Sequence, residues 1–267
     1  MLTVPEFTAR KNKQGAEKLK ISMLTCYDSS FAKIVNESSI DCILVGDSSA
    51  MVMHGHSSTV HATTKMIATH VSAVARGAPD KFIIGDLPFL SIRKDLKSSV
   101  EACKKLIQAG AHAVKMEGIQ GNAELVHHLV HSGVPVMGHL GLTPQFVHQL
   151  GGMKVQGKSI EAAEQILRDA RAFEQAGAFA LVLECVPSDV ARKITAALTI
   201  PTIGIGAGPD TDGQVLVLHD LLGFDPTFKP KFLRRYLNGH ELMLSAFERF
   251  HTDVQSGTFP TPEESYT

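Results

Sequence analysis

Short apolar runs recur along the chain, and most are followed by a polar residue and then by a longer stretch of mixed polarity. The runs are rich in Val, Ile, Leu and Met and do not alternate strictly with polar residues. This pattern is typical of strands that are buried on both faces of a parallel sheet. The runs lie at residues 20–28, 41–49, 82–89, 113–118, 135–141, 180–186, 201–208 and 214–220.

Amphipathic stretches between these runs predict helices. They lie at residues 29–38, 64–77, 97–109, 121–132, 160–176 and 188–198. Gly110, Gly133 and Gly177 follow three of them, as expected at helix C-termini. Alternating strands and helices predict parallel βαβ units, and this many runs favours closure into a single (β/α)8 TIM barrel over an open sheet. We expect one domain over residues 1–267, with an N-terminal segment that caps the barrel.

The last two runs fit this scheme less simply. The interval between residues 201–208 and 214–220 is short for a parallel crossover, which takes about a dozen residues or more. Either the intervening helix has shrunk to a turn around GPDTDG (208–213), or the run at 214–220 is not the last barrel strand. Residues 228–250 are predicted to form the final helix, and residues 251–267 a polar tail.

Composition narrows the function classes. Lys and Arg (26) nearly balance Asp and Glu (27), so neither a nucleic-acid surface nor a basic membrane-binding stripe is expected. The N-terminus lacks the apolar core of a signal peptide, and no run reaches the roughly 18 apolar residues of a membrane helix. Four widely spaced cysteines without a C-x-x-C pair predict reduced thiols in a cytoplasmic protein.

Polar residues gather where the apolar runs end. They are Asp28, Asp47 with Ser48, Asp86, Glu117, His139, Glu184, a glycine-rich turn at 206–208, and His219 with Asp220. Barrel enzymes build their active sites at the carboxyl ends of the strands and in the loops that follow. We therefore expect these side chains to form one polar ring.

Several carboxylates in one ring repel each other unless a cation lies between them. Oxygen ligands without a Cys or His cluster favour Mg²⁺ over Zn²⁺. Asp47 and Asp86, each preceded by glycine at the end of an apolar run, are the best candidates for direct ligands. Glu117 could bind directly or through a water molecule. The alternative for an Asp after a strand is a helix cap or a turn residue.

Three further residues are candidates for the chemistry. Lys115 lies two residues before Glu117 on an apolar strand, so both side chains point to one face. Glu184 ends a very apolar run, where loss of water makes a carboxylate a stronger base. It is read as a general base, with a buried structural ion pair as the alternative. His139 belongs either to the site or to a hydrogen-bonded structural contact.

Other patterns are less specific. GIGAG (204–208) is not a G-x-G-x-x-G motif, and it is expected to form a tight turn at the barrel mouth. His54 and His56 lie in a loop that could cover the site. The histidines predicted to lie on the outer surface of a helix are His127, His128 and His131.

Longer segments carry a resemblance to a known family. LVGDS (44–48), GDLPF (85–89), VKMEG (114–118), VPVMGHLGLTPQ (134–145), LVLECVP (181–187) and IPTIGIGAGPDTDGQVLVLHD (200–220) closely resemble the ketopantoate hydroxymethyltransferase family. The resemblance extends over about residues 3–266. It implies a TIM barrel of the phosphoenolpyruvate/pyruvate superfamily, Mg²⁺ dependence and a homodecamer. The implied substrates are 3-methyl-2-oxobutanoate and 5,10-methylenetetrahydrofolate, and the implied product is ketopantoate.

The same motifs imply roles for individual residues. The resemblance implies a metal site of Asp47, Asp86 and Glu117, and a proton acceptor at Glu184. The residues expected to contact the 2-oxo acid are Asp47, Ser48, Asp86 and Lys115, to which we add His139. The family commonly has Leu-Gly where this chain has Ser49 and Ala50, so the loop near the metal could follow a different path.

Two other functions stay open at this point. A lyase similar to phosphoenolpyruvate mutase or isocitrate lyase would also bind a 2-oxo acid on Mg²⁺. Those enzymes usually carry a K-x-C-G-H-type loop with a reactive cysteine, and this sequence has none. A barrel that only binds 2-oxo acids would leave the acidic ring unexplained.

Overall fold

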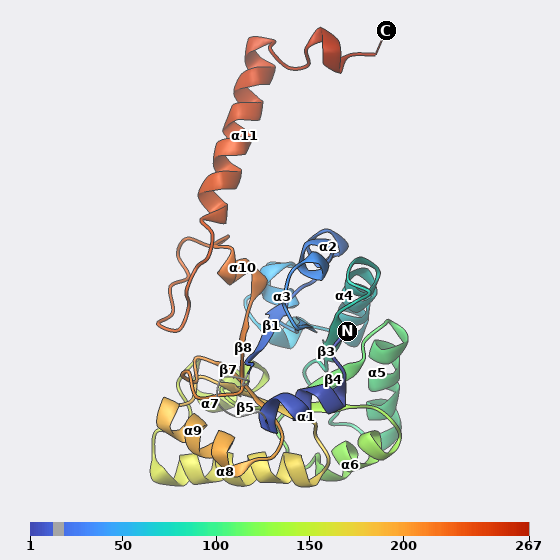
Figure 1. Cartoon of the computed structure of the whole chain (residues 1–267), viewed down its shortest axis with the longest axis vertical. Helices are drawn as coiled ribbons and strands as arrows, with labels where there is room; N and C mark the ends of the chain where they lie inside the picture. The colour runs from blue at the N-terminus through green and yellow to red at the C-terminus, as the bar shows by residue number, and fades with distance from the viewer. Residues whose placement is uncertain (13–18, 267) are drawn as a thin grey trace. The chain divides into compact units, whose positions relative to one another are not determined.

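The first part of the chain folds as a closed barrel of eight parallel strands. The computed structural model describes residues 1–12 and 19–266, whose contacts group into two units, Met1–Val217 and Leu218–Thr267. In the first unit each strand pairs with its neighbours in sequence, and the last pairs back with the first (Figure 1). The strands are β1 (Ile21–Thr25), β2 (Cys42–Val45), β3 (Phe82–Asp86), β4 (Ala113–Glu117), β5 (Val136–Gly141), β6 (Ala180–Glu184), β7 (Thr202–Ile205) and β8 (Gly213–Leu216). Each apolar run overlaps one strand, which confirms the predicted TIM barrel.

Helices connect most of the strands, as the sequence predicts. They are α2 (Ser29–Glu37), α4 (Thr64–Gly77), α5 (Leu96–Gln108), α6 (Ala123–His131), α8 (Ile160–Gln175) and α9 (Ser188–Ala197). Several begin at a side chain that accepts a backbone N–H of the first turn, as Thr63, Asp95 and Ser159 do. These caps satisfy donors that have no partner within the helix.

The amino-terminal half of the barrel interior is filled with apolar side chains. Inward-facing residues of all eight strands form one buried cluster, which Phe7 of helix α1 (Val4–Asn12) joins. The ring centroid of Phe7 lies 5.4 Å from that of Phe82 and 5.3 Å from that of Phe179. Helix α1 thus closes this end of the barrel, and the predicted capping segment is confirmed.

A turn of residues 206–212 joins β7 to β8. Gly206 and Gly208 adopt φ of 63° and 79°, a conformation that glycine takes without strain. A side chain at position 208 would also lie 2.5 Å from the Cβ of Ser188. The alternative in which helix seven has shrunk to a turn is therefore confirmed, and the run at 214–220 supplies the last barrel strand.

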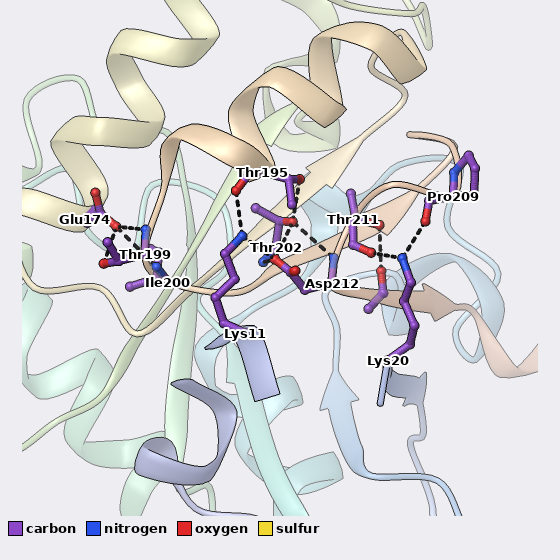
Figure 2. Close-up of polar contacts among 11 residues, drawn as sticks. Lys11, Lys20, Glu174, Thr195, Thr199, Ile200, Thr202, Pro209, Thr211 and Asp212 are labelled. Carbon is purple, nitrogen blue, oxygen red and sulfur yellow. Dashed lines mark hydrogen bonds and ion pairs between the residues drawn. The ribbon is translucent and has the colours of Figure 1, made fainter. Parts of the chain in front are cut away.

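A buried ion pair ties α1 to this turn (Figure 2). The Nζ of Lys11 donates to Asp212 Oδ2 at 2.8 Å and to the carbonyl oxygen of Thr195 at 2.6 Å. The same Asp212 oxygen accepts a hydrogen bond from the backbone N–H of Thr202 at 3.0 Å. On the same side of the barrel, Lys20 donates to two carbonyl oxygens of the turn. These bonds hold the helix cap and the β7–β8 connection together.

The second unit corrects the prediction for the C-terminal region. It contains α10 (Leu218–Leu221), α11 (Gly239–Ser256) and the short 3-10 helix η4 (Pro262–Glu264). The prediction of a helix over 228–250 and a polar tail from 251 is wrong at both ends. Prolines at 226 and 230 lack the N–H that a helix needs, and Gly257, with φ of 73°, ends α11.

The polar residues His219 and Asp220 do not end a strand, contrary to the prediction. Strand β8 ends at Leu216, and both residues belong to α10 of the second unit rather than to the end of a strand. The prediction of one domain over 1–267 stays a prediction. Among the residues that the structure describes, no helix is both long and apolar enough to cross a membrane.

The buried pair of Lys11 and Asp212 yields a prediction about stability. Asp212→Ala leaves the largely buried Lys11 ammonium without its carboxylate, so it is expected to lower the free energy of unfolding by about 3–5 kcal/mol. The control is Glu101→Ala, which removes an exposed pair with Lys104 and is expected to cost under about 1 kcal/mol. Chemical denaturation measures both. Equal effects would show that the buried pair does not stabilise the cap.

Candidate active site

The inward faces of neighbouring strands become polar toward their carboxyl ends. Successive side chains of a strand alternate between its two faces, so Asp86, Lys115, Glu117, His139 and Glu184 all fall on the inward face, in line with the apolar cluster below. The strand register sets Asp86 beside Lys115, and Glu117 beside His139. Four adjacent strands, β3 to β6, therefore bring these five side chains to the barrel mouth.

Lys115 and Asp86 form a buried ion pair at the mouth. The Nζ of Lys115 donates to Asp86 Oδ2 at 2.6 Å, and the two side chains are 4% and 1% exposed. The backbone N–H of Asp47 donates to the same oxygen at 3.2 Å. Burial alone would lower the pKa of Lys115, but the carboxylates of Asp86, Asp47 and Glu117 outweigh it and raise that pKa. Lys115 is therefore a fixed positive charge.

Asp47 follows β2 and is also buried. Its Oδ2 accepts a hydrogen bond from the side-chain amide of Gln145 at 2.9 Å. Burial raises the pKa of Asp47 well above its usual range, and the charges of Asp86 and Glu117 raise it further. A cation placed near this carboxylate would stabilise its charged form.

His139 lies between two carboxylates. Its Nδ1 is 3.2 Å from Glu117 Oε1, and its Nε2 is 3.3 Å from Glu184 Oε2. Burial and the charge of Lys115 lower the pKa of His139, but contacts with Glu117 and Glu184 outweigh them and raise it to about 9. The imidazole thus connects the acid of β4 to the acid of β6. Glu184, with 21% of its side chain exposed, is less buried than the other acids of the mouth.

Ser48 is held by a residue that the sequence patterns did not single out. Its Oγ lies 2.8 Å from the hydroxyl of Tyr27, whose ring is buried. Ser49 and Ala50, where the chain departs from the family, begin the short helix α3 (Ser49–Val52) and are fully buried. Because helical backbone needs no glycine, the loss of glycine at position 50 does not by itself disturb the loop.

Asp28 does not join the site. Its Oδ1 accepts the backbone N–H groups of Ser30 at 2.8 Å and of Phe31 at 3.0 Å, so it caps α2. This is the alternative that the sequence left open for every Asp after a strand. The predicted surface position of the α6 histidines is confirmed, because all three are exposed.

The structure adds Gln145 to the site. It lies in the 3-10 helix η3 (Pro144–Phe146), which follows β5, and it contacts Asp47, Leu87 and Glu117. It stands in the GHLGLTPQ motif, but a glutamine in a loop gave no chemical signal of its own. The loop after β2 also reaches this place, because its 3-10 helix η2 (Thr59–His61) contacts η3.

The oxygen atoms of the mouth fit a divalent cation. Within residues 1–12 and 19–266, Asp86 Oδ1 and Glu117 Oε1 are buried and receive no well-oriented hydrogen bond. Asp47, Asp86, Glu117 and Glu184 carry four negative charges when ionised. Lys115 and protonated His139 carry two positive charges, so two negative charges remain. Hard oxygen ligands with this net charge suit Mg²⁺. We call Asp47, Asp86, Lys115 and Glu117 the mouth cluster.

The cluster is not a closed metal cage. In the described part of the chain, no three His, Cys, Asp or Glu side chains converge closely enough to enclose a metal as they lie. Mg²⁺ does not require such a cage, because it is commonly held by one or two carboxylates and keeps water or substrate oxygens as further ligands. The geometry therefore fits a site with two protein carboxylates better than one with three.

A closed parallel barrel with acids and a buried lysine at its mouth has the architecture of a TIM-barrel enzyme. Solved structures of similar fold include 2,3-dimethylmalate lyase, with a TM-score of 0.62 and 14% identity over 98% of this chain and 93% of that one. Another is phosphoenolpyruvate phosphomutase from Streptomyces platensis subsp. rosaceus, with a TM-score of 0.61 and 12% identity over 95% and 88%. At these identities the likeness concerns the fold alone.

Closer relatives define the family. The sequence profile of ketopantoate hydroxymethyltransferase matches residues 2–262. A 3-methyl-2-oxobutanoate hydroxymethyltransferase of Bdellovibrio bacteriovorus is 58% identical over 267 residues, which cover both chains completely. One of Coxiella burnetii is 54% identical over 260 residues, which cover 97% of this chain and 96% of the relative. The chain belongs to the ketopantoate hydroxymethyltransferase family and is an enzyme, a one-carbon transferase. This assignment replaces the lyase-like and non-catalytic alternatives.

The environment of His139 yields a prediction about pH in metal-free protein. Because its folded pKa of about 9 exceeds its ordinary value of 6.5, the stabilisation is complete below pH 6.5 and is lost as the pH rises through 9. The gap in free energy of unfolding between the unsubstituted protein and His139→Gln is expected to narrow by on the order of 3 kcal/mol over this range. Denaturation in EDTA at several pH values measures it. A gap independent of pH would contradict the charged state assigned to His139.

Proposed function

We propose that this enzyme transfers a hydroxymethyl group from 5,10-methylenetetrahydrofolate to C3 of 3-methyl-2-oxobutanoate and so forms ketopantoate. The names of its relatives support the reaction. The observation that carries the proposal is the mouth cluster. In it one fixed lysine charge stands among three buried carboxylates, and Asp86 Oδ1 has no hydrogen-bond donor in the described part of the chain. We further propose, from the family resemblance, that the chain acts as a cytoplasmic homodecamer.

Asp47 and Asp86 would hold Mg²⁺, and Glu117 would bind it directly or through water. When bound, Mg²⁺ would act as a Lewis acid and a template that makes the C3–H of the 2-oxo acid more acidic. The protein contributes the orientation of these acids. The Asp86 carboxylate is fixed by Lys115, and the Asp47 carboxylate is fixed by Gln145.

Lys115 would stabilise the negative charge that develops on the substrate as C3 loses its proton. A charged donor that is already in place costs no reorganisation during the reaction, which is why such groups lower barriers in sites from which water is excluded. The neighbouring carboxylates keep Lys115 protonated by raising its pKa. Ser48, bound to the hydroxyl of Tyr27, would add a neutral contact to the 2-oxo acid.

Glu184 would remove the proton from C3. It ends β6 on the inward face, and its greater exposure leaves it more accessible to a substrate than the buried acids. His139, 3.3 Å from Glu184 Oε2, would hold the carboxylate in place while C3 forms its bond to the one-carbon unit of the folate. The carbon–nitrogen bonds of that unit would break to release tetrahydrofolate, and water would supply the hydroxyl oxygen. This arrangement requires glycine at position 141. A Cβ there would lie 2.2 Å from the carbonyl oxygen of Glu184 and would collide with it.

The direct test is formation of ketopantoate from the two proposed substrates, with Mg²⁺ and with EDTA. Product is expected only when the folate, the 2-oxo acid and Mg²⁺ are all present. Product formed at an equal rate in EDTA would reject the metal, and product formed without the folate would reject the one-carbon donor.

The base assignment yields a prediction about proton exchange. In deuterated water with Mg²⁺, the enzyme is expected to exchange the C3 proton of 3-methyl-2-oxobutanoate. Glu184→Gln keeps the size of the side chain but cannot accept the proton, so exchange should fall at least about 100-fold. NMR measures the loss of the C3–H signal.

The matched control is Glu164→Gln, the same substitution at an exposed position on α8. It should leave the exchange unchanged. If Glu184→Gln exchanges as fast as the control while binding the 2-oxo acid equally well, another residue is the base.

A further inference from the structure

Gln145 joins three separate segments of the barrel mouth. Its side-chain Nε2 donates to Asp47 Oδ2 at 2.9 Å and to the carbonyl oxygen of Leu87 at 2.9 Å. Its backbone N–H donates to Glu117 Oε2 at 3.1 Å. The residue is 8% exposed, so these bonds lie away from solvent. One glutamine therefore links the segments after β2 and β3 to the end of β4.

The side-chain amide can be oriented in only one way. Both partners of Nε2, a carboxylate oxygen and a carbonyl oxygen, are acceptors in the form that binds a metal. The two amide hydrogens are used on these two partners. A flipped amide would set its own oxygen against both, so the hydrogen bonds fix Gln145, and Gln145 in turn fixes the Asp47 carboxylate.

The same bonds divide the carboxylate oxygens into two sets. Gln145 occupies Oδ2 of Asp47 and Oε2 of Glu117, while Lys115 occupies Oδ2 of Asp86. Asp86 Oδ1 is buried without a hydrogen bond from any residue that the structure describes, whereas Glu117 Oε1 lies 3.2 Å from His139 Nδ1. Protein donors thus hold one oxygen of each acid, and the second oxygen of Asp86 is left for a cation.

Gln145 also fixes its acids without neutralising them. Lys115 and His139 already cancel two of the four negative charges of the mouth, and a third cation at position 145 would leave only one to attract a metal. An amide donor holds the carboxylate and leaves its charge intact. The neutral donor therefore suits a site that must bind a doubly charged ion.

We propose that Gln145 is a positioning residue of the metal site, which orients Asp47 through its side chain and Glu117 through its backbone. The inference rests on the metal site of the proposed function. It assigns Gln145 no contact with the reacting atoms, because it acts through the two acids.

The test is the affinity for Mn²⁺ and Mg²⁺ in the absence of substrates, measured by isothermal titration calorimetry. Gln145→Met removes both amide hydrogens, keeps the side-chain length and leaves the backbone bond to Glu117. Loss of such a supporting contact typically costs about 10–100-fold in metal affinity, and we expect a loss of this size. The matched control is Gln165→Met, which removes an exposed amide bonded to Asp169 at 2.8 Å and should change nothing.

Steady-state kinetics separate positioning from general damage to the fold. If Gln145 acts through the metal ligands, the Mg²⁺ concentration for half-maximal activity rises by the factor seen in calorimetry, and excess Mg²⁺ restores kcat. A variant with damaged structure would not be restored by Mg²⁺. If Gln145→Met does not fold, Gln145→Asn serves instead, because it keeps the amide but is too short to reach both acceptors.

Unchanged metal affinity in a folded variant would overturn the positioning role and leave the proposed function intact. A kcat that falls and is not restored by excess Mg²⁺, with unchanged affinity, would overturn it as well. If the unsubstituted enzyme itself binds neither Mn²⁺ nor Mg²⁺, the metal site of the proposed function fails, and this inference fails with it.

Discussion

The organisation of this enzyme depends on the unfavourable free energy of burying several carboxylates together at one end of a barrel. A charge out of water is tolerated only when it is paired or hydrogen-bonded. Asp86 has Lys115 as its partner, Asp47 has the amide of Gln145, and Glu117 has a backbone N–H. These contacts reduce the repulsion without removing it, because two negative charges remain. We propose that this remaining negative charge gives the mouth an affinity for a divalent ion.

The rest of the barrel keeps these groups in register. Parallel pairing aligns the ends of β3 to β6, so residues far apart in sequence become neighbours. Below them the interior is apolar and closed by Phe7, which keeps water from the lower half. The ion pair of Lys11 and Asp212 fastens that cap to the β7–β8 turn, where a typical barrel would have a helix. Stability and catalysis therefore occupy opposite ends of one barrel.

The features that depend on periodicity could be predicted from the sequence. The contacts that depend on the path of a loop could not. Runs buried on both faces predicted all eight strands. The polar ends of these runs predicted that Asp86, Glu117 and Glu184 would lie on the same inward face of the barrel mouth. Asp28 and Asp47 both follow a strand, but only the backbone shows that Asp28 caps a helix. Gln145 could not be predicted, because its contacts arise from the η3 turn folding back across the mouth. Helix α11 begins later than predicted, after a segment that contains Pro226 and Pro230, and Gly257 marks its end.

The central claim is that acids of separate strands share one divalent ion, and crystals soaked in Mn²⁺ test it most directly. Mn²⁺ accepts the same oxygen ligands as Mg²⁺ and scatters anomalously. One strong anomalous peak is expected at the barrel mouth, in contact with a carboxylate oxygen of Asp47 and one of Asp86. Crystals saturated with Mn²⁺ that show no peak there, or a peak away from both acids, would contradict it.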